Sequence, residues 1–226
     1  VDGRSLDARQ YRCVDEVLSI SEIPDKDVFE VHIRVVNLPA NNTALEGLYQ
    51  SGQFLLTQCE AEGFRKITYY LDRPDVMAPF SVTLRGDKQR YPVLLSNGNP
   101  VDQGDLENGR HFVTWDDPFP KPAYLFALVA GDLDWIEDHY TTRSGRKVRL
   151  RIYMERENKD RCWHAMDSLK NALRWDEETY GLEYDLDIYN IVVTNDFNMG
   201  AMENKGLNIF NAKYVLADPE TATDWD

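Results

Sequence analysis

A short polar segment in the last third of the chain combines residue types that can hold a peptide. Gly200 lets another backbone come close, and an extended segment there leaves N–H and C=O groups free to pair with an added strand. Glu203 would place one carboxylate beside that strand. The five residues Gly-Ala-Met-Glu-Asn also fit an ordinary turn with a solvated glutamate, because a motif of this length carries a real risk of chance occurrence.

Two apolar runs flank this segment and predict the strands that position it. Residues 188–193 are rich in β-branched side chains, which is typical of a buried strand. Residues 207–210 predict a second strand. The polar residues therefore lie between two predicted strands.

The motif is part of a longer match. Residues 197–211 resemble the exopeptidase signature of the zinc aminopeptidase N family, and residues 57–65, Thr-Gln-Cys-Glu-Ala-Glu-Gly-Phe-Arg, resemble its second substrate-binding segment. Further matching segments follow in the order of the family: 72–76, 95–99, 118–131, 175–178 and 184–189. The resemblance covers roughly residues 40 to 224 and points to the bacterial alanyl aminopeptidases.

The resemblance implies that Glu60 and Glu203 hold the free α-amino group of a peptide substrate. An α-ammonium is a compact cation with three donors, so two carboxylates in a cleft bind it through charge-assisted hydrogen bonds. An internal peptide nitrogen has no charge and would leave both carboxylates unpaired. Such a pair makes a peptidase an exopeptidase.

Other substrate contacts follow from the same resemblance. Gln58 and Met199 would line the pocket for the first side chain, and Met suits a broad pocket. Gly200 and Ala201 would give backbone contacts, and Asn204 would hold the segment in shape. The implied substrate-binding set is Gln58, Glu60, Met199, Gly200, Ala201, Met202, Glu203 and Asn204. A nucleophilic role for Cys59 is disfavoured, because no histidine is placed by sequence to activate its thiol.

The resemblance also implies zinc, with ligands expected as H-E-x-x-H on a helix and a further glutamate downstream. The chain contains four histidines, none with a partner four residues on: His32, His111, His139 and His164. We expect each to be a structural or surface residue. The zinc ligands and the catalytic residues are expected C-terminal to Asp226, and the chain is expected to be an N-terminal excerpt that begins partway into its first domain.

The resemblance implies a zinc-dependent aminopeptidase that releases N-terminal amino acids from peptides, and we expect the 226-residue chain alone to be inactive. The alternative is a noncatalytic peptide-binding or scaffold module of the same family. An epoxide-hydrolysing relative is a weaker third option. An intact motif from Gly200 to Asn204 favours the enzyme, since a module without peptide substrate has no evident need for an amine anchor.

Composition limits the partners. A formal charge of −14 disfavours nonspecific binding to nucleic acid and docking on anionic membranes. No run approaches the ~18 to 20 apolar residues of a membrane span. Three widely spaced cysteines suit reduced thiols in a cytoplasmic protein. The sequence leaves the oligomeric state open, with a monomer favoured for the full-length protein.

The predicted fold has two parts. Residues 1–132 predict a β-rich sandwich or saddle-shaped domain that lacks its first strands, with alternating runs at 28–35, 67–71, 80–84 and 112–115. In this part Asn97-Gly98 fits a two-residue hairpin turn, and the proline-rich residues 118–122 fit a rigid extended connection rather than a central strand.

Residues 133–226 predict the start of an α+β catalytic domain, thermolysin-like by resemblance, cut before the zinc-binding helix. A half-buried strand is predicted over 148–154. Apolar residues at helical spacing follow from Cys162 to Leu173, with Asn158 or Asp160 as N-cap and Gly181 past the helix end.

Overall fold

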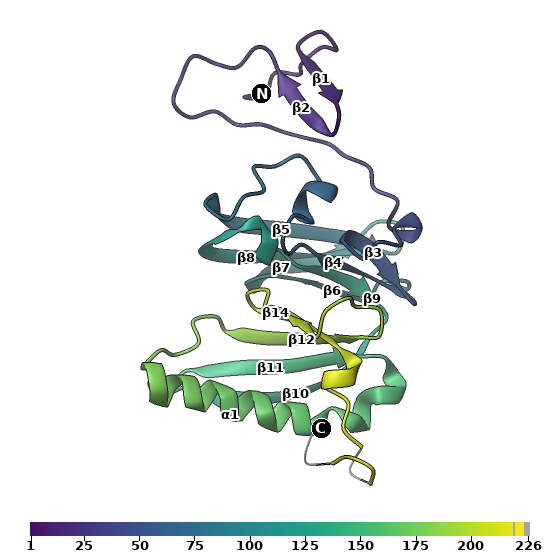
Figure 1. Ribbon diagram of the computed structural model, residues 1–226, viewed down its shortest axis with the longest axis vertical. Helices are drawn as coiled ribbons and strands as arrows, with labels where there is room; N and C mark the ends of the chain where they lie inside the picture. Colours follow the sequence, from purple (N-terminus) through teal and green to yellow (C-terminus); the bar gives the residue numbers. More distant parts are fainter. Residues whose placement is uncertain (219, 224–226) are drawn as a thin grey trace.

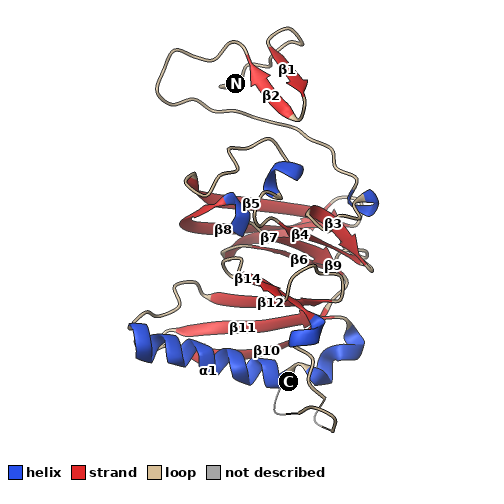
Figure 2. Ribbon diagram, in the orientation of Figure 1, coloured by secondary structure: helices blue, strands red, loops and turns tan. Residues whose placement is uncertain are grey.

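The computed structural model describes residues 1–218 and 220–223 and arranges them in three tiers (Figure 1). A small hairpin stands apart at the N-terminal end. Two antiparallel sheets fill the middle tier, and a mixed sheet with the one long helix forms the third (Figure 2). The strands are β1 Tyr11–Val14, β2 Val17–Ile20, β3 Gly47–Ser51, β4 Phe54–Gln58, β5 Met77–Asp87, β6 Val93–Ser96, β7 Asn99–Leu106, β8 Arg110–Pro122, β9 Leu128–Gly131, β10 Asp134–Thr141, β11 Lys147–Met154, β12 Ile188–Thr194, β13 Ala201–Met202 and β14 Leu207–Asn211.

The helix α1 spans Trp163–Tyr180, and the other helical segments are short 3-10 turns. These turns are Pro39–Asn41, Phe64–Lys66, Ala123–Leu125, Arg156–Arg161 and Ala212–Tyr214. No described helix has the length and apolar character that crossing a membrane requires.

The first tier is weakly packed. Among the described strands, β1 and β2 pair only with each other, and residues 21–38 form no strand. The strand predicted over 28–35 is therefore wrong, as is the one predicted over 67–71. Alternation produces a strand only where a neighbouring strand takes up its backbone hydrogen bonds and one face is covered. Residues 28–35 have no described strand paired with them, and Val28 is 81% exposed.

The middle tier consists of a four-stranded sheet, β3-β4-β9-β6, and a three-stranded sheet, β5-β8-β7, together called the N-terminal sheets below. The alternating runs at 80–84 and 112–115 are strands, as predicted. Asn108 and Gly109 both have positive φ and join β7 to β8 in a tight hairpin. The predicted Asn97-Gly98 hairpin is wrong, because β6 and β7 belong to different sheets.

Gly98 is needed for a different reason. Its φ is +89°, and a Cβ added there would lie 2.1 Å from the carbonyl oxygen of Asp116.

The proline-rich run 118–122, predicted as a connection rather than a central strand, instead continues β8, the central strand of its sheet. It pairs only with β5, after a register shift, and has no described pairing on its β7 side. Proline is tolerated there because one side needs no N–H donors.

The third tier is a five-stranded sheet in the order β10-β11-β12-β14-β13, called the C-terminal sheet. α1 connects β11 to β12, which run parallel, and covers one face of the sheet (Figure 2). Its buried residues, such as Met166 and Leu169, join Leu150 and Ile152 of β11 in one apolar cluster. The strands predicted over 148–154, 188–193 and 207–210 are all present.

The predicted helix ends as expected. Gly181 is left-handed at φ 69°, and its N–H donates to the carbonyl of Glu177. The predicted N-cap is wrong. Residues Arg156–Arg161 wind into a 3-10 helix, and Cys162 precedes α1 without a side-chain cap.

The opposite face of the C-terminal sheet packs on the N-terminal sheets. One apolar cluster contains Tyr49 and Trp115 from the middle tier together with Val192 and Ile209 from β12 and β14. β9 ends at Gly131 and β10 begins at Asp134 in another sheet. Because a shared core joins both parts, the domain division at 132/133 stays a prediction.

Candidate functional site

The motif segment, residues 195–206, connects β12 to β14 and carries one short strand. β13 pairs antiparallel with β14, with Ala201 opposite Phe210 and Met202 opposite Ile209. It is the last strand of the sheet, so within residues 1–218 and 220–223 its outer edge has no strand beside it. An edge strand presents N–H and C=O groups to any extended peptide laid against it.

Side chains along the motif segment alternate between the core and the surface. Met202 and Asn204 are buried, whereas Glu203 is exposed. Gly200 makes room for a neighbouring ring, since a Cβ added there would lie 3.2 Å from Cε2 of Tyr214. The Glu203 carboxylate therefore stands on the open side of the segment while its neighbours fix the strand to the core.

Glu60 lies just after a buried strand. Gln58, the last residue of β4, and Cys59 are buried, and Glu60 is the first exposed residue after them. The chain then turns tightly, with the N–H of Gly63 donating to the carbonyl of Cys59 at 2.9 Å. A Cβ at Gly63 would come within 2.3 Å of the Gln58 carbonyl oxygen, so only glycine fits this turn.

One side-chain contact joins these two elements. Nε2 of Gln58 lies 3.2 Å from Sδ of Met199. Gln58 is two residues before Glu60, and Met199 is four residues before Glu203. The contact brings together two of the predicted pocket residues and sets the β4 end beside the motif segment.

Both carboxylates are free to take a cation. Within the part of the chain that the structure describes, neither the Glu60 nor the Glu203 carboxylate takes part in an ion pair or hydrogen bond, although the backbone carbonyl of Glu60 accepts from Nε2 of Gln58 at 3.4 Å. The buried Gln58 Oε1 and both amide atoms of Asn204 also have no hydrogen-bond partner there. Asn204 takes part in holding the segment only through its backbone, whose carbonyl accepts from the N–H of Leu207 at 3.0 Å.

Residues that the sequence did not single out hold the start of the motif segment. The hydroxyl of Tyr49 on β3 donates to the carbonyl of Asp196 at 2.9 Å. Ser51 Oγ, also on β3, donates to Oδ2 of Asp196 at 2.7 Å. Burial raises the pKa of Tyr49, which keeps its hydroxyl a neutral donor.

Asn211 closes the segment on itself. Its N–H donates to the carbonyl of Gly200 at 2.9 Å, and its Nδ2 donates to the carbonyl of Phe197 at 3.2 Å. Asn211 is the last residue of the segment that resembles the exopeptidase signature, and this position was the one feature of the sequence that could have pointed to its role.

Cys59 lies beneath the Glu60 turn and is fully buried. Burial, with a further contribution from the Asp72 carboxylate, raises the pKa of its thiol. A raised pKa keeps the thiol protonated and therefore unreactive as a nucleophile.

The described residues do not fit a zinc ion. Within residues 1–218 and 220–223 no group of three His, Cys, Asp or Glu side chains could hold a metal. His32 lies 3.0 Å from a Glu30 oxygen, and His111 Nε2 lies 2.7 Å from the carbonyl of Tyr91.

Two cavities lie away from these residues. One of about 610 Å³ opens between β6 to β8 and β10 to β12, and another of about 490 Å³ is lined by the N-terminal hairpin and residues 31–34. Neither is lined by the motif segment or by Glu60. The candidate site comprises an open strand edge and two exposed carboxylates.

Two family models match the chain. The Peptidase M1 N-terminal domain matches residues 8–125, and the Peptidase family M1 domain matches residues 164–226. The chain belongs to the peptidase M1 family. This confirms the family inferred from the motif segment and the Glu60 segment.

Curated relatives agree with this assignment. The chain is 66% identical to aminopeptidase N of Escherichia coli over 209 residues, which cover 92% of this chain and 24% of that protein. It is 60% identical to aminopeptidase N of Haemophilus influenzae over 207 residues, covering 91% of this chain and 24% of that protein. The chain thus spans about a quarter of the length of these relatives.

A solved structure supports the fold. Legionella pneumophila aminopeptidase A, in a crystal structure with aspartic acid, superimposes with a TM-score of 0.89 at 36% identity. The match covers 99% of this chain and 26% of that chain. The predicted β-rich domain followed by the start of an α+β domain is confirmed.

Proposed function

We propose that the whole protein is a zinc-dependent aminopeptidase and that this chain supplies the groups that hold the substrate's α-ammonium, Glu60 and Glu203. The observation that carries the proposal is the contact between Gln58 and Met199, which sets the two carboxylate-bearing segments side by side. Membership of the peptidase M1 family and the aminopeptidase relatives support the reaction class.

Each element of the site has one task in this proposal. The two carboxylates accept hydrogen bonds from the ammonium and fix the first residue of the peptide. The free edge of β13, near Ala201, pairs with the substrate backbone. Met199, 37% exposed, and Gln58 line the space for the first side chain. Together these groups determine which peptide bond of the substrate is cleaved, counted from its amino end.

The hydrolytic chemistry belongs to residues outside this chain. Zinc, when bound, would polarise the scissile carbonyl in the whole enzyme, and we expect its ligands beyond Asp226. Because the described residues hold no candidate ligand set, the 226-residue chain alone should neither hydrolyse amides nor keep zinc after dialysis. Hydrolysis by the chain, or one equivalent of bound zinc, would overturn this part of the proposal.

Glu203→Ala in the complete enzyme tests the anchor role. Removing one partner of a charge pair that the substrate desolvates typically costs on the order of 2 kcal/mol or more. We expect kcat/KM on an unblocked amino-acid amide to fall at least about 30-fold. Zinc content should not change, because Glu203 is an anchor rather than a ligand.

Two controls make the result specific. Glu62→Ala removes another exposed carboxylate of the same loop and should leave kcat/KM within about twofold of wild type. N-acetylated substrates should be poor for the wild type and lose little more in Glu203→Ala. If Glu203→Ala loses the zinc, or has the same kcat/KM as Glu62→Ala, the anchor role is wrong. The interpretation then favoured is a noncatalytic module of the family or a relative that catalyses a different reaction.

A further inference from the structure

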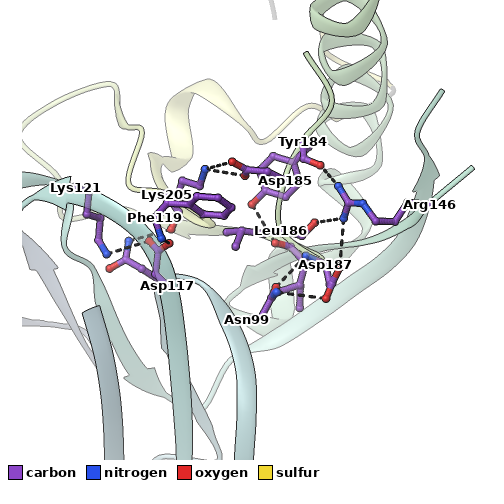
Figure 3. A network of polar contacts seen from close by, with 12 residues as sticks. Asn99, Asp117, Phe119, Lys121, Arg146, Tyr184, Asp185, Leu186, Asp187 and Lys205 are labelled. Atoms are coloured by element: carbon purple, nitrogen blue, oxygen red, sulfur yellow. Dashed lines mark hydrogen bonds and ion pairs between the residues drawn. The ribbon is translucent and has the colours of Figure 1, made fainter. Parts of the chain in front are cut away.

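The far end of the motif segment is held by a group of contacts shown in part in Figure 3. Lys205 directly follows Glu203 and Asn204, and its Nζ lies 2.7 Å from Asp185 and 4.3 Å from the ring centroid of Phe119. Phe119 belongs to β8 of the N-terminal sheets, whereas Asp185 precedes β12. One lysine side chain thus bridges the two parts of the molecule next to the proposed anchor.

A buried ion pair positions Phe119 beside Lys205. Asp117 and Lys121 pair at 2.9 Å and are 0% and 4% exposed. Oδ1 of Asp117 also accepts from the N–H of Phe119 at 3.2 Å. Because one carboxylate contacts β8 on both sides of Phe119, the aromatic ring is fixed where Lys205 meets it (Figure 3). Burial lowers the pKa of Lys121 against the opposing effect of Asp117, as expected for a desolvated pair.

Asn97 makes the second attachment. Its Nδ2 donates to the carbonyl of Lys205 and to the carbonyl of Leu125, each at 2.9 Å, and its Oδ1 accepts from the N–H of Ala127 at 2.8 Å. The residue is 1% exposed. One amide therefore pairs with three backbone groups, two in the connection between β8 and β9 and one in the motif segment.

Close backbone approach completes the junction. Gly206 has φ +73°, and a Cβ added there would lie 3.3 Å from the backbone nitrogen of Gly98 and 2.9 Å from Cδ1 of Leu186. The motif segment is thus fixed at its start by Tyr49 and at its end by Asn97. Glu203 sits two residues from the second fixed point.

We propose that Asn97 and Lys205 are positioning residues that set Glu203 at the correct distance from Glu60, so that both carboxylates reach one ammonium. The inference rests on the proposed function, because it assigns how that site is aligned. Glu60 is carried by the N-terminal sheets and Glu203 by the C-terminal sheet, so their spacing depends on the contacts between the two. A misplacement of about 1 Å can cost roughly 100-fold in rate.

The test uses Asn97→Ala and Lys205→Met in the complete enzyme. Lys205→Met keeps an aliphatic chain over Phe119 but removes the charge that meets Asp185. We expect kcat/KM on an unblocked amide to fall at least about tenfold in Asn97→Ala and about three- to tenfold in Lys205→Met. Part of the loss should appear as a higher KM, since the ammonium is also held in the ground state.

Lys170→Met is the matched control. Lys170 pairs with Asp138 at 2.6 Å, and the side chains are 29% and 40% exposed, close to the 28% and 42% of Lys205 and Asp185. This pair lies between α1 and β10, away from the motif segment. Its loss should leave KM and kcat within about twofold of wild type.

A double-mutant cycle separates positioning from general destabilisation. If Lys205 acts through Glu203, Lys205→Met should change kcat/KM by less than about twofold when Glu203 is already Ala. An undiminished effect in that background, or variants that behave like Lys170→Met, would overturn the inference while Glu203→Ala still supports the anchor. If Glu203→Ala itself has no effect, the proposed function fails and the inference falls with it. Should Asn97→Ala not fold, the Lys205 cycle alone decides.

Discussion

The two segments that carry the proposed anchors are held in different ways. The Glu60 loop, residues 59–76, is fixed by neighbours from its own part of the chain, whereas the motif segment around Glu203 is fixed both by its own sheet and by Tyr49 and Asn97 of the N-terminal part. The first anchor therefore depends on local packing. The position of the second depends on how the two parts of the molecule dock.

Local contacts account for the Glu60 loop. Phe64 packs edge-on against Phe126 at 5.1 Å and Tyr70 at 5.2 Å between ring centroids. The N–H of Arg65 donates to Oδ2 of Asp72 at 2.9 Å. A destabilising substitution inside this loop should displace Glu60 and leave the motif segment in place. A substitution at the contacts between the two parts of the molecule should displace the motif segment and leave Glu60 in place.

Phe64→Ala should have the largest effect on stability. The side chain is 7% exposed and contacts three aromatic rings, so its loss should cost about 3–5 kcal/mol. We expect a lower urea midpoint and faster alkylation of Cys59, which lies beneath the loop. Phe29→Ala, at an exposed phenylalanine, is the control. Equal midpoints for the two variants would contradict local fixation of the Glu60 loop.

Tyr49→Phe tests the docking side with a smaller change. It removes one hydroxyl and leaves the carbonyl of Asp196 without that donor, which should cost about 1–2 kcal/mol. In the complete enzyme KM for a free-amine substrate should rise, because the motif segment is loosened, while Cys59 stays as protected as in wild type. Tyr11→Phe, at an exposed tyrosine, should change neither quantity. Faster alkylation of Cys59 in Tyr49→Phe would show that the two segments are not held independently.

Thiol labelling should affect activity least. Cys13 is exposed, whereas Cys59 and Cys162 are buried. Burial raises the pKa of Cys162 to about 11 and raises that of Cys59 further, so both stay protonated at pH 8. We expect mass spectrometry of the native protein to show one alkylated thiol, at Cys13, with activity retained. Rapid labelling of Cys59 in the wild type would show that the Glu60 loop opens more easily than its packing implies.

The fold could be predicted from the sequence where the pattern and the packing agree. β11 alternates and has strands on both sides, so its pattern was a reliable guide. Residues 28–35 alternate equally well and form no strand, because no neighbouring strand pairs with them. Asn-Gly makes a hairpin at 108–109 but a sheet-to-sheet link at 97–98. Local chemistry predicts a turn, whereas the partners of the flanking strands decide its use.

The site shows the same limit. Glu60 and Glu203 were assigned by resemblance, and the structure sets their segments together through Gln58 and Met199. The supporting contacts of Tyr49 and Asn97 were not predicted. Each joins residues more than a hundred positions apart, 147 for Tyr49 with Asp196 and 108 for Asn97 with Lys205. Rules based on the spacing of residues along the sequence predict contacts within one helix, strand or turn, and they do not predict contacts between residues this far apart.

The most direct measurement of the central claim compares two inhibitors of the complete enzyme that differ only in the amine. A free amino acid and its desamino analogue should be tested against wild type, Glu60→Ala and Glu203→Ala. We predict that the wild type prefers the amine at least about 30-fold and that either substitution removes most of this preference. An unchanged preference for the amine in both variants would contradict the account.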